Sequence, residues 1–309
     1  MSFAVGVEEE LFLVDAETLE PVPLFSSVVP EPDERIKPEL FECIVEITTP
    51  PCRDADEVLT SLVALRRELG ERAACRGATI LAAGTHPTAR GEGQAIVPKP
   101  RYRELAAKLG DGVSRQLVCG LHVHVDVGDW NLGSRAFRGL VRRLPSILAL
   151  SVNSPYDEGC DSGLASVRAG RLAELPTGGP PPVDLPADDR DFTRVHWDLR
   201  PNYRLGTVEV RIADQQTDVR RSAALAGLVQ ALAIWESGQR PERCDLDRYR
   251  EEREAAAAGR LDPSELLEFA SRFPWADVLA GPSEAERQLA LGLCGAVRDL
   301  ADRSLEWPA

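Results

Sequence analysis

The stretch Gly120-Leu121-His122-Val123-His124-Val125-Asp126 alternates apolar residues with imidazole and carboxylate side chains. Successive side chains of a β-strand point to opposite faces of the sheet. The alternation therefore predicts a strand whose leucine and valines pack on one face, while His122, His124 and Asp126 lie together on the other.

Three more stretches show the same alternation: Val7-Glu8-Glu9-Glu10-Leu11, Glu42-Cys43-Ile44-Val45-Glu46 and Val208-Glu209-Val210-Arg211-Ile212. Parity places Glu8 with Glu10, Glu42 with Glu46, and Glu209 with Arg211. Glu9 falls on the packing side, so we expect it at a β-bulge or at the rim of the sheet. Four such strands predict one sheet that covers a core on one face and lines a polar cavity with the other.

Helical periodicity is expected over residues 54–75, 134–152, 218–235, 263–273 and 283–305, and a short buried strand over 79–84. Asp218 is the expected N-cap of its helix. We expect the last two helices to cover the outer face of the sheet. Strands and helices do not alternate regularly, and neither G-x-G-x-x-G nor G-x-x-x-x-G-K-[ST] occurs, which disfavours a doubly wound nucleotide-binding sheet.

Composition limits the classes of protein to consider. The 309 residues allow one large domain or two, and a hydrophobic content of 43% provides for a substantial core. A net charge of -14 argues against a nucleic-acid or anionic-membrane surface. Seven scattered cysteines without a C-x-x-C pair favour reduced thiols. With no basic leader and no membrane-length apolar run, we expect a cytoplasmic location. The Pro/Gly-rich segment at about 175–191 is either a connector or a lid.

The polar faces offer an oxygen-rich set of ligands, which suits Mg²⁺ or Mn²⁺ better than zinc or copper. The set consists of Glu8, Glu10, Glu42, Glu46, Glu209 and His122. Arg211, with Arg200 and Arg204 upstream, adds guanidinium groups that bind phosphate oxygens in a fork geometry. Cations and arginines around one cavity are what phosphoryl transfer from a nucleotide requires. The alternative for any single strand is a salt-bridge ladder, and for His122 an ordinary hydrogen-bonded histidine.

Several motifs together resemble the carboxylate-amine ligases, the type 2 glutamate-cysteine ligase family. They occur in the family's order and reach from the N-terminus to about Thr217. They are Gly6-Val7-Glu8-Glu9-Glu10-Leu11, Val45-Glu46-Ile47-Thr48-Thr49-Pro50, Ala83-Gly84-Thr85-His86-Pro87, Pro98-Lys99-Pro100-Arg101-Tyr102, Cys119-Gly120-Leu121-His122-Val123-His124-Val125, and Trp197-Asp198-Leu199-Arg200-Pro201 leading to Val208-Glu209-Val210-Arg211-Ile212-Ala213-Asp214.

The resemblance implies a single α+β catalytic domain over residues 1–309 with a glutamine synthetase-like fold. In that fold a curved, mostly antiparallel sheet forms a funnel, with helices packed on its outer face. It also implies ATP and Mg²⁺ (or Mn²⁺) as cofactors, a small amino acid or amine as substrate, an acyl phosphate intermediate and a possible homodimer.

The same resemblance implies roles for particular residues. Arg211 would stabilise the transferring phosphoryl group, and Arg200 and His124 would line the phosphate or substrate site. The implied metal ligands are Glu8, Glu10, Glu46, His122 and Glu209.

Two segments depart from the family pattern. A tyrosine-rich stretch resembling D-T-G-Y-A-S-Y-R-S is here Asp161-Ser162-Gly163-Leu164-Ala165-Ser166-Val167-Arg168-Ala169, without either tyrosine. A stretch resembling E-N-R-W-R-A-A-R-Y-G is here Arg250-Glu251-Glu252-Arg253-Glu254-Ala255-Ala256-Ala257-Ala258-Gly259. These departures affect regions expected to select the substrate or close over it. The alternatives are a catalytically divergent binding or regulatory protein derived from a ligase, and a metal-dependent hydrolase using His122 and His124.

Overall fold

The computed structural model describes residues 3–186, 192, 195–240 and 242–307. Its largest element is a seven-stranded sheet in the order β10-β11-β5-β1-β3-β2, with β4 paired to the far half of β1. All pairings in this sheet are antiparallel. The strands are β1 (Val5–Asp15), β2 (Ile36–Pro38), β3 (Ile44–Thr48), β4 (Ala78–Leu81), β5 (Leu121–Asp126), β10 (Leu199–Asn202) and β11 (Thr207–Val210). The sheet and its flanking helices confirm the expected α+β class.

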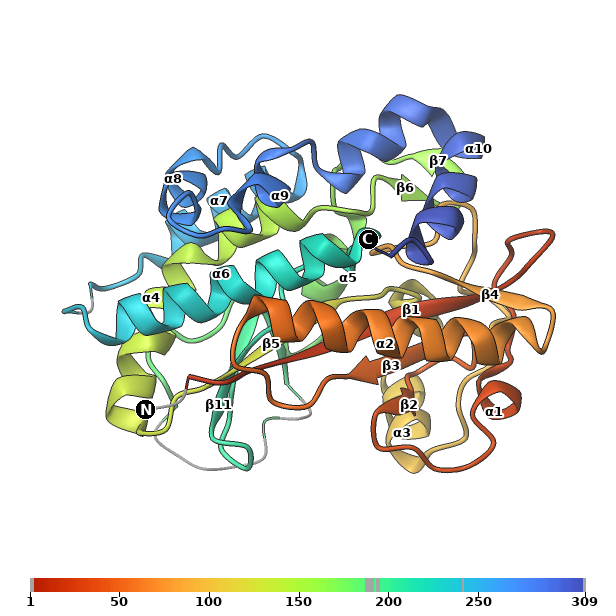
Figure 1. Ribbon diagram of the computed structural model, residues 1–309, viewed down its shortest axis with the longest axis horizontal. Coiled ribbons are helices and arrows are strands. Elements are labelled where there is room, and N and C mark those ends of the chain that lie inside the picture. The colour runs from red at the N-terminus through yellow and green to blue at the C-terminus, as the bar shows by residue number, and fades with distance from the viewer. Residues whose placement is uncertain (1–2, 187–191, 193–194, 241, 308–309) are drawn as a thin grey trace.

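Three long helices pack on one face of this sheet, where α2 and α6 lie side by side (Figure 1). They are α2 (Ala55–Ala74), α4 (Trp130–Ser151) and α6 (Val219–Ser237). Each begins at an aspartate, Asp54, Asp129 or Asp218, whose carboxylate accepts a backbone N–H of the first turn. The buried apolar side chains of β1, β3 and β5 form one core with these helices.

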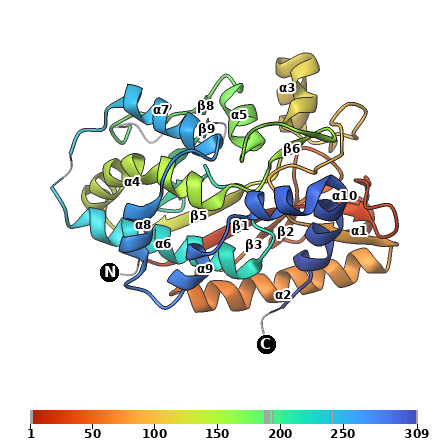
Figure 2. The same cartoon turned by 90° about the horizontal axis from the view of Figure 1, so that it is seen from above.

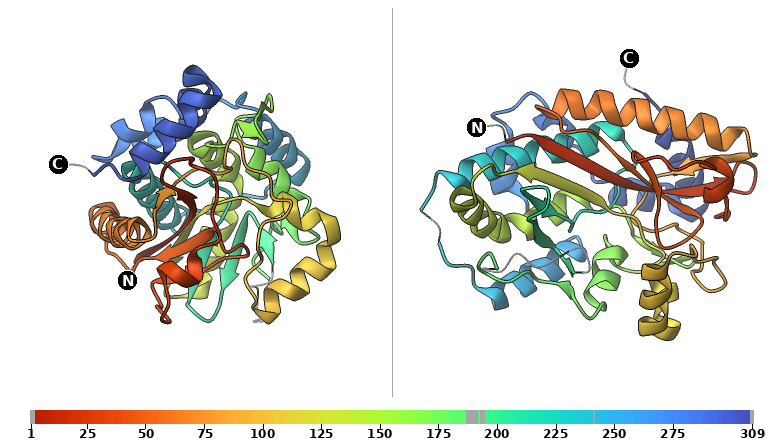
Figure 3. Two further views of the ribbon diagram at one scale, coloured as in Figure 1. Left: turned by 90° about the vertical axis from the view of Figure 1, so that its right-hand side faces the viewer. Right: turned by 90° about the horizontal axis from the view of Figure 1, so that it is seen from below.

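Shorter elements lie on the opposite side of the sheet from α2 (Figures 2 and 3). They are α3 (Pro100–Leu109), the 3-10 helix Gly110–Gln116, α5 (Val167–Ala173), and the small parallel pair β8 (Gly178–Gly179) and β9 (His196–Trp197). The sheet therefore has a helix-covered face and a face enclosed by short elements. This second face carries the polar side chains of the alternating strands.

We expected the last two helices to cover the outer face of the sheet, but the C-terminal helices do not cover it. The chain continues through α7 (Leu246–Ala257), α8 (Ser264–Ala270), α9 (Ala276–Ala280) and α10 (Glu284–Ser304). Helix α8 contacts α4 and α9, and α10 contacts β4. Leu300 and Ala301 of α10 join a second core with Phe12 and Val14. Periodicity predicted a buried stripe on each helix, but it does not state which surface the stripe meets.

Most other elements follow the expectation. Helices α2 and α6 match the predicted segments and their acidic N-termini, whereas α4 begins at Trp130 and continues through Pro145. The remaining short elements are α1 (Phe25–Val28), β6 (Tyr156–Asp157) and β7 (Cys160–Asp161). Of the Pro/Gly-rich segment, residues 187–191 lie outside the described residues, and the start forms β8. Within the part of the chain that is described, no helix is long and apolar enough to cross a membrane.

Glu9 contradicts both positions expected for it. Its register with Ile47 and Leu121 is regular, so there is no bulge at this position, and its side chain is fully buried on the helix face. Arg66 of α2 donates two hydrogen bonds of 2.7 Å to the Glu9 carboxylate, and Ser222 of α6 donates a third. A buried cation therefore allows a carboxylate to occupy a core position.

Candidate active site

A cavity of about 730 Å³ lies between the polar face of the sheet and the short elements opposite. Most of the residues predicted for the site line it: Glu8, Glu10, Glu46, His122, His124, Arg200, Arg204 and Arg211. Glu209 is fully buried and lies directly behind this lining, in contact with Arg200, Arg211 and His124. The sheet thus brings together side chains that are up to about two hundred residues apart in the sequence.

Strand register explains why these side chains meet. Glu8 of β1 lies opposite His122 of β5, and Glu10 of β1 lies opposite Glu46 of β3. On the other side of β5, His124 lies opposite Glu209 of β11. Residues directly opposite in an antiparallel pair share a face and approach closely.

The first group of candidate ligands consists of Glu8, His124 and Glu209, whose ligand atoms lie within 4.8 Å of one another. His124 Nε2 lies 3.5 Å from Glu8 Oε1 and 3.8 Å from Glu209 Oε1. Arg200 Nε donates to Glu209 Oε2 at 2.7 Å, and Arg211 donates to Glu209 Oε1. This end of the cavity therefore combines carboxylates with two guanidinium groups, the combination that binds phosphate together with a cation.

The second group consists of Glu10, Glu39 and Glu46, again with ligand atoms within 4.8 Å of one another. The Gly120 amide donates to Glu10 Oε2 at 2.6 Å, and Lys37 Nζ lies 3.7 Å from Glu46 Oε1. Three carboxylates sharing so small a volume repel one another unless a proton or a cation lies between them.

The two groups differ in their electrostatics. Burial raises the pKa of Glu10 to about 7, and it raises the pKa of Glu46 well above its usual range, with neighbouring carboxylates adding to both shifts. Burial also opposes ionisation of Glu8 and Glu209. However, the nearby imidazoles of His122 and His124 hold the pKa of Glu8 well below its usual range, and His124 with the two arginines lowers the pKa of Glu209. Glu8 and Glu209 of the first group are therefore ionised at neutral pH, whereas Glu10 and Glu46 of the second group hold their protons more tightly than an ordinary carboxyl group.

His122 lies between the groups. Its Nδ1 is 3.3 Å from Glu8 Oε2 and its Nε2 is 3.8 Å from Glu10 Oε1. Burial, helped by the charge of Arg211, lowers the pKa of His122 to about 3, so the ring is neutral. Among the described residues, the buried Nε2 atoms of His122 and His124 have no hydrogen-bond partner. Unpartnered imidazole nitrogens beside clustered carboxylates fit divalent cations such as Mg²⁺ or Mn²⁺.

Two residues of the predicted polar faces lie outside this arrangement. Glu42 precedes β3 in a turn, and its carboxylate accepts hydrogen bonds from the Ser26 hydroxyl and amide. The strand predicted to begin at Glu42 begins at Ile44, so the predicted parity with Glu46 was wrong, and Glu42 does not line the cavity with the other expected ligands. Asp126 ends β5 and accepts the Gly128 amide at 2.8 Å.

Among the residues of the cavity that sequence reasoning missed, Glu39 and Arg168 are charged and lie close to the candidate ligands. Glu39 follows the short strand β2, where no alternation is long enough to be recognised. Arg168 is 1% exposed and lines the cavity from α5. Its signal was available, because it is the arginine that the departing segment 161–169 shares with the family pattern.

The family model for glutamate-cysteine ligase family 2 matches residues 4–290. The chain belongs to this family. A putative glutamate-cysteine ligase of Rubrobacter xylanophilus is 38% identical over 248 residues, which cover 74% of this chain and 66% of that relative. A putative glutamate-cysteine ligase of a Roseiflexus species is 34% identical over 250 residues, covering 75% and 66%. The chain thus spans about two thirds of the length of these relatives.

Solved structures show the same fold at low sequence identity. The glutamate-cysteine ligase of Francisella tularensis, crystallised with AMP, has a TM-score of 0.67 and 13% identity, covering 99% of this chain and 90% of that one. A bifunctional glutathione synthetase from Pasteurella multocida has a TM-score of 0.61 and 13% identity, covering 98% and 49%. These structural similarities confirm the expected glutamine synthetase-like fold of the chain.

Proposed function

We propose that this chain is an ATP-dependent carboxylate-amine ligase of the glutamate-cysteine ligase type. One observation carries the proposal: two groups of candidate cation ligands share β1 and one cavity, and the first group is flanked by Arg200 and Arg211. Family membership supports the same reaction class. In this reaction a carboxylate takes the γ-phosphoryl group of ATP, and ADP leaves. An amine then attacks the acyl phosphate, and inorganic phosphate leaves.

The residues divide this work between the two ends of the cavity. Divalent cations held by Glu8, His124 and Glu209 and by Glu10, Glu39 and Glu46 would neutralise phosphate and carboxylate oxygens. His122 lies within reach of both groups. Arg200 makes two hydrogen bonds to Glu209, which fix its guanidinium at the cavity wall. Arg211 has the position to stabilise the charge that develops on the transferred phosphoryl group.

Cavity shape supports a reaction based on positioning. A volume of about 730 Å³ holds a nucleotide together with a small substrate, and no covalent intermediate with the protein is required. Glutamate as the acid and cysteine as the amine are the first pair to test, because the family carries their names. Because segments 161–169 and 250–259 depart from the family pattern, other acids and amines are to be tested after this pair.

The test is a screen of amino acids and small amines for stimulated ADP release in the presence of Mg²⁺. We expect release to need ATP, the cation and an added acid together. Glu46→Gln and Glu209→Gln should abolish it, and Arg211→Ala should lower kcat more than it weakens nucleotide binding.

Two outcomes would replace the proposal. Stabilisation by nucleotide without ADP release under any condition would make the chain a binding or regulatory protein. Bond hydrolysis that needs the cation but not ATP would make it a metal-dependent hydrolase.

A further inference from the structure

The backbone of Arg211 is held from two sides, by the buried Arg168 side chain and by the backbone of the buried Asp198. Strand β11 ends at Val210, so Arg211 is no longer part of the β-ladder that fixes Glu209. Its amide nevertheless donates to the Asp198 carbonyl at 2.9 Å. Its carbonyl accepts from Arg168 Nη2 at 3.1 Å, and Arg168 Nη1 donates to the next carbonyl, that of Ile212, at 3.2 Å.

On the amide side, the contact depends on helix α7. The Asp198 carboxylate is 1% exposed, and Arg253 donates to it through Nε at 2.7 Å and Nη2 at 3.1 Å. The Tyr249 hydroxyl donates to the same carboxylate at 2.7 Å. A bidentate, buried pair of this kind fixes both partners in one geometry. Asp198 therefore holds the Arg211 amide at a point that α7 determines.

On the carbonyl side, the contact depends on helix α5. Arg168 is 1% exposed, and its guanidinium lies against Gly120, where an added Cβ would come within 2.1 Å of Nη2. The lack of a side chain at Gly120 gives the guanidinium room to reach the two carbonyls. Arg253 Nη2 also donates to the Ala169 carbonyl of α5 at 2.9 Å, which joins the two sides.

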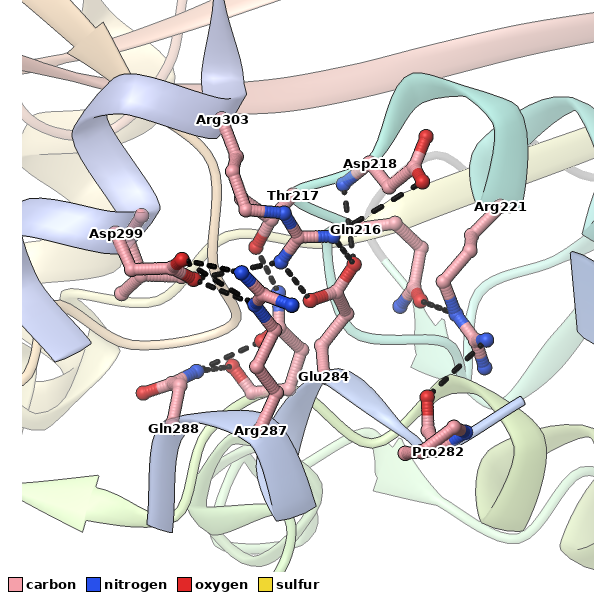
Figure 4. A network of polar contacts seen from close by, with 12 residues as sticks. Gln216, Thr217, Asp218, Arg221, Pro282, Glu284, Arg287, Gln288, Asp299 and Arg303 are labelled. Atoms are coloured by element: carbon pink, nitrogen blue, oxygen red, sulfur yellow. Dashed lines mark hydrogen bonds and ion pairs between the residues drawn. The ribbon is translucent and has the colours of Figure 1, made fainter. Parts of the chain in front are cut away.

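The far end of the same segment is anchored separately. Figure 4 shows Glu284 of α10 between Arg303 and the start of α6, where its carboxylate accepts hydrogen bonds from the Asp218 amide at 3.2 Å and from Arg303 Nη1 at 2.6 Å. Gln288 donates to Asn153 nearby. These contacts hold Asp218, whereas the backbone of Arg211 itself is contacted by Arg168 and Asp198.

We propose that Arg168 and Arg253 are positioning residues that hold the Arg211 backbone from its carbonyl and amide sides, so that the Arg211 guanidinium stays on Glu209 and beside His122. This inference rests on the proposed function for its effect on turnover. Both arginines come from segments that depart from the family pattern, 161–169 and 250–259. These segments, whose tyrosines, Asn and Trp are missing, thus still contribute to the site through their buried arginines.

The test compares Arg253→Met with Arg250→Met. Arg250 lies on the same helix, is half-exposed and pairs with Asp247 at 2.7 Å, so it is a matched surface control. We expect Arg253→Met to lower kcat on the order of 10²-fold with an unchanged Kd for the nucleotide, because a displacement of about 1 Å at a transition-state contact has that effect. Arg250→Met should leave both values unchanged.

A second background distinguishes positioning from general damage. In Arg211→Lys, the added Arg253→Met change should alter kcat by no more than about twofold, since both changes remove the same interaction. An equal fall of kcat in both backgrounds would overturn the proposal. Should Arg253→Met fail to fold, Tyr249→Phe removes one hydrogen bond to Asp198 and should lower kcat by a smaller factor, with the same dependence on Arg211.

Backbone hydrogen exchange gives a readout that is independent of turnover. We expect the peptide that contains Arg211 to exchange faster in Arg253→Met than in Arg250→Met, while peptides from α2 exchange equally in both. If the wild-type protein releases no ADP with any acid and amine, the proposed function fails, and this exchange still decides on the positioning. Equal exchange at Arg211 in the two variants would overturn it.

Discussion

Strand β1 presents consecutive glutamates to two very different environments. On the helix face, both carboxylate oxygens of Glu9 accept hydrogen bonds from Arg66, and one also accepts from Ser222 at 2.5 Å. The remaining donors of Arg66 bind the carbonyls of Gln216 and Thr217, each at 2.7 Å. Glu9 is therefore fully compensated within the protein.

One residue further, on the cavity face, Glu10 lies with Glu39 and Glu46 instead of with an arginine pair. Burial raises the pKa of Glu10, whereas the Glu9 carboxylate forms a buried ion pair with Arg66. The difference teaches that carboxylates buried for stability are matched inside the fold, and carboxylates buried for binding are left for a ligand to match.

The largest expected effect is on the helix face, where Arg66 pairs with Glu9. Arg66→Met leaves Glu9 as an unpaired buried charge, so we expect the free energy of unfolding to fall by about 3–5 kcal/mol, measured by denaturant titration. Adding Glu9→Gln should recover part of this loss, because it removes the uncompensated charge. A loss as small as that of an exposed ion pair, below about 1 kcal/mol, would mean that Glu9 does not need Arg66.

On the cavity face, cations from solution should supply the positive charge that neutralises the carboxylates. We expect Mg²⁺ or Mn²⁺ at a hundredfold excess over Kd to raise the free energy of unfolding by about 3 kcal/mol, and EDTA to reverse it. Glu46→Gln should remove most of this gain. A gain that persists undiminished in Glu46→Gln would separate the second carboxylate group from cation binding.

Without cations, the buried carboxylates of the cavity should make the stability of the protein depend on pH. The pKa of Glu10 is about 7 in the folded protein, against an ordinary 4.5. Between these values the unfolded chain loses a proton that the folded protein keeps, so stability falls as pH rises from about 4.5 to about 7 and stays low above.

Glu10→Gln should flatten this slope and gain about 1 kcal/mol at pH 8 in metal-free protein, a typical gain for relieving strain in a functional site. Chemical denaturation across the pH range measures both effects. An unchanged slope in the variant would assign the pH dependence to other groups.

The smallest effect is expected at Glu42, the carboxylate that sequence parity paired with Glu46. Because it binds Ser26 outside the cavity, Glu42→Gln should change the free energy of unfolding by no more than about 0.5 kcal/mol and leave the gain from Mg²⁺ intact. The same titrations used for Glu46→Gln measure this. Loss of the Mg²⁺ gain would return Glu42 to the ligand set.

Much of the site followed from strand parity. Glu8, Glu10, His122 and Glu209 meet because alternation is a local property that the backbone enforces wherever a strand forms. The acidic N-caps of α2 and α6 were readable for the same reason, since a cap satisfies backbone groups only a few residues away.

Strand parity did not predict the position of a side chain where that position depends on the end of a strand or on a partner far away in the sequence. Glu42 lies one turn before the strand, and Glu39 follows a strand of three residues, too short to show a pattern. Glu9 has the parity of the core residues, and only the position of Arg66 shows why a charge can lie there. Arg168 comes from a helix, which has no parity relation to the sheet.

The sequence alone determined which side chains share a face, where the principal helices begin and to which family the chain is similar, because these depend on neighbours along the chain. Only the tertiary structure decided the order of the strands, the division of the ligands into two groups, and the buried partners of Glu9 and Arg211. Those depend on contacts between distant segments, where burial makes charges interact strongly enough to set which carboxylates stay ionised.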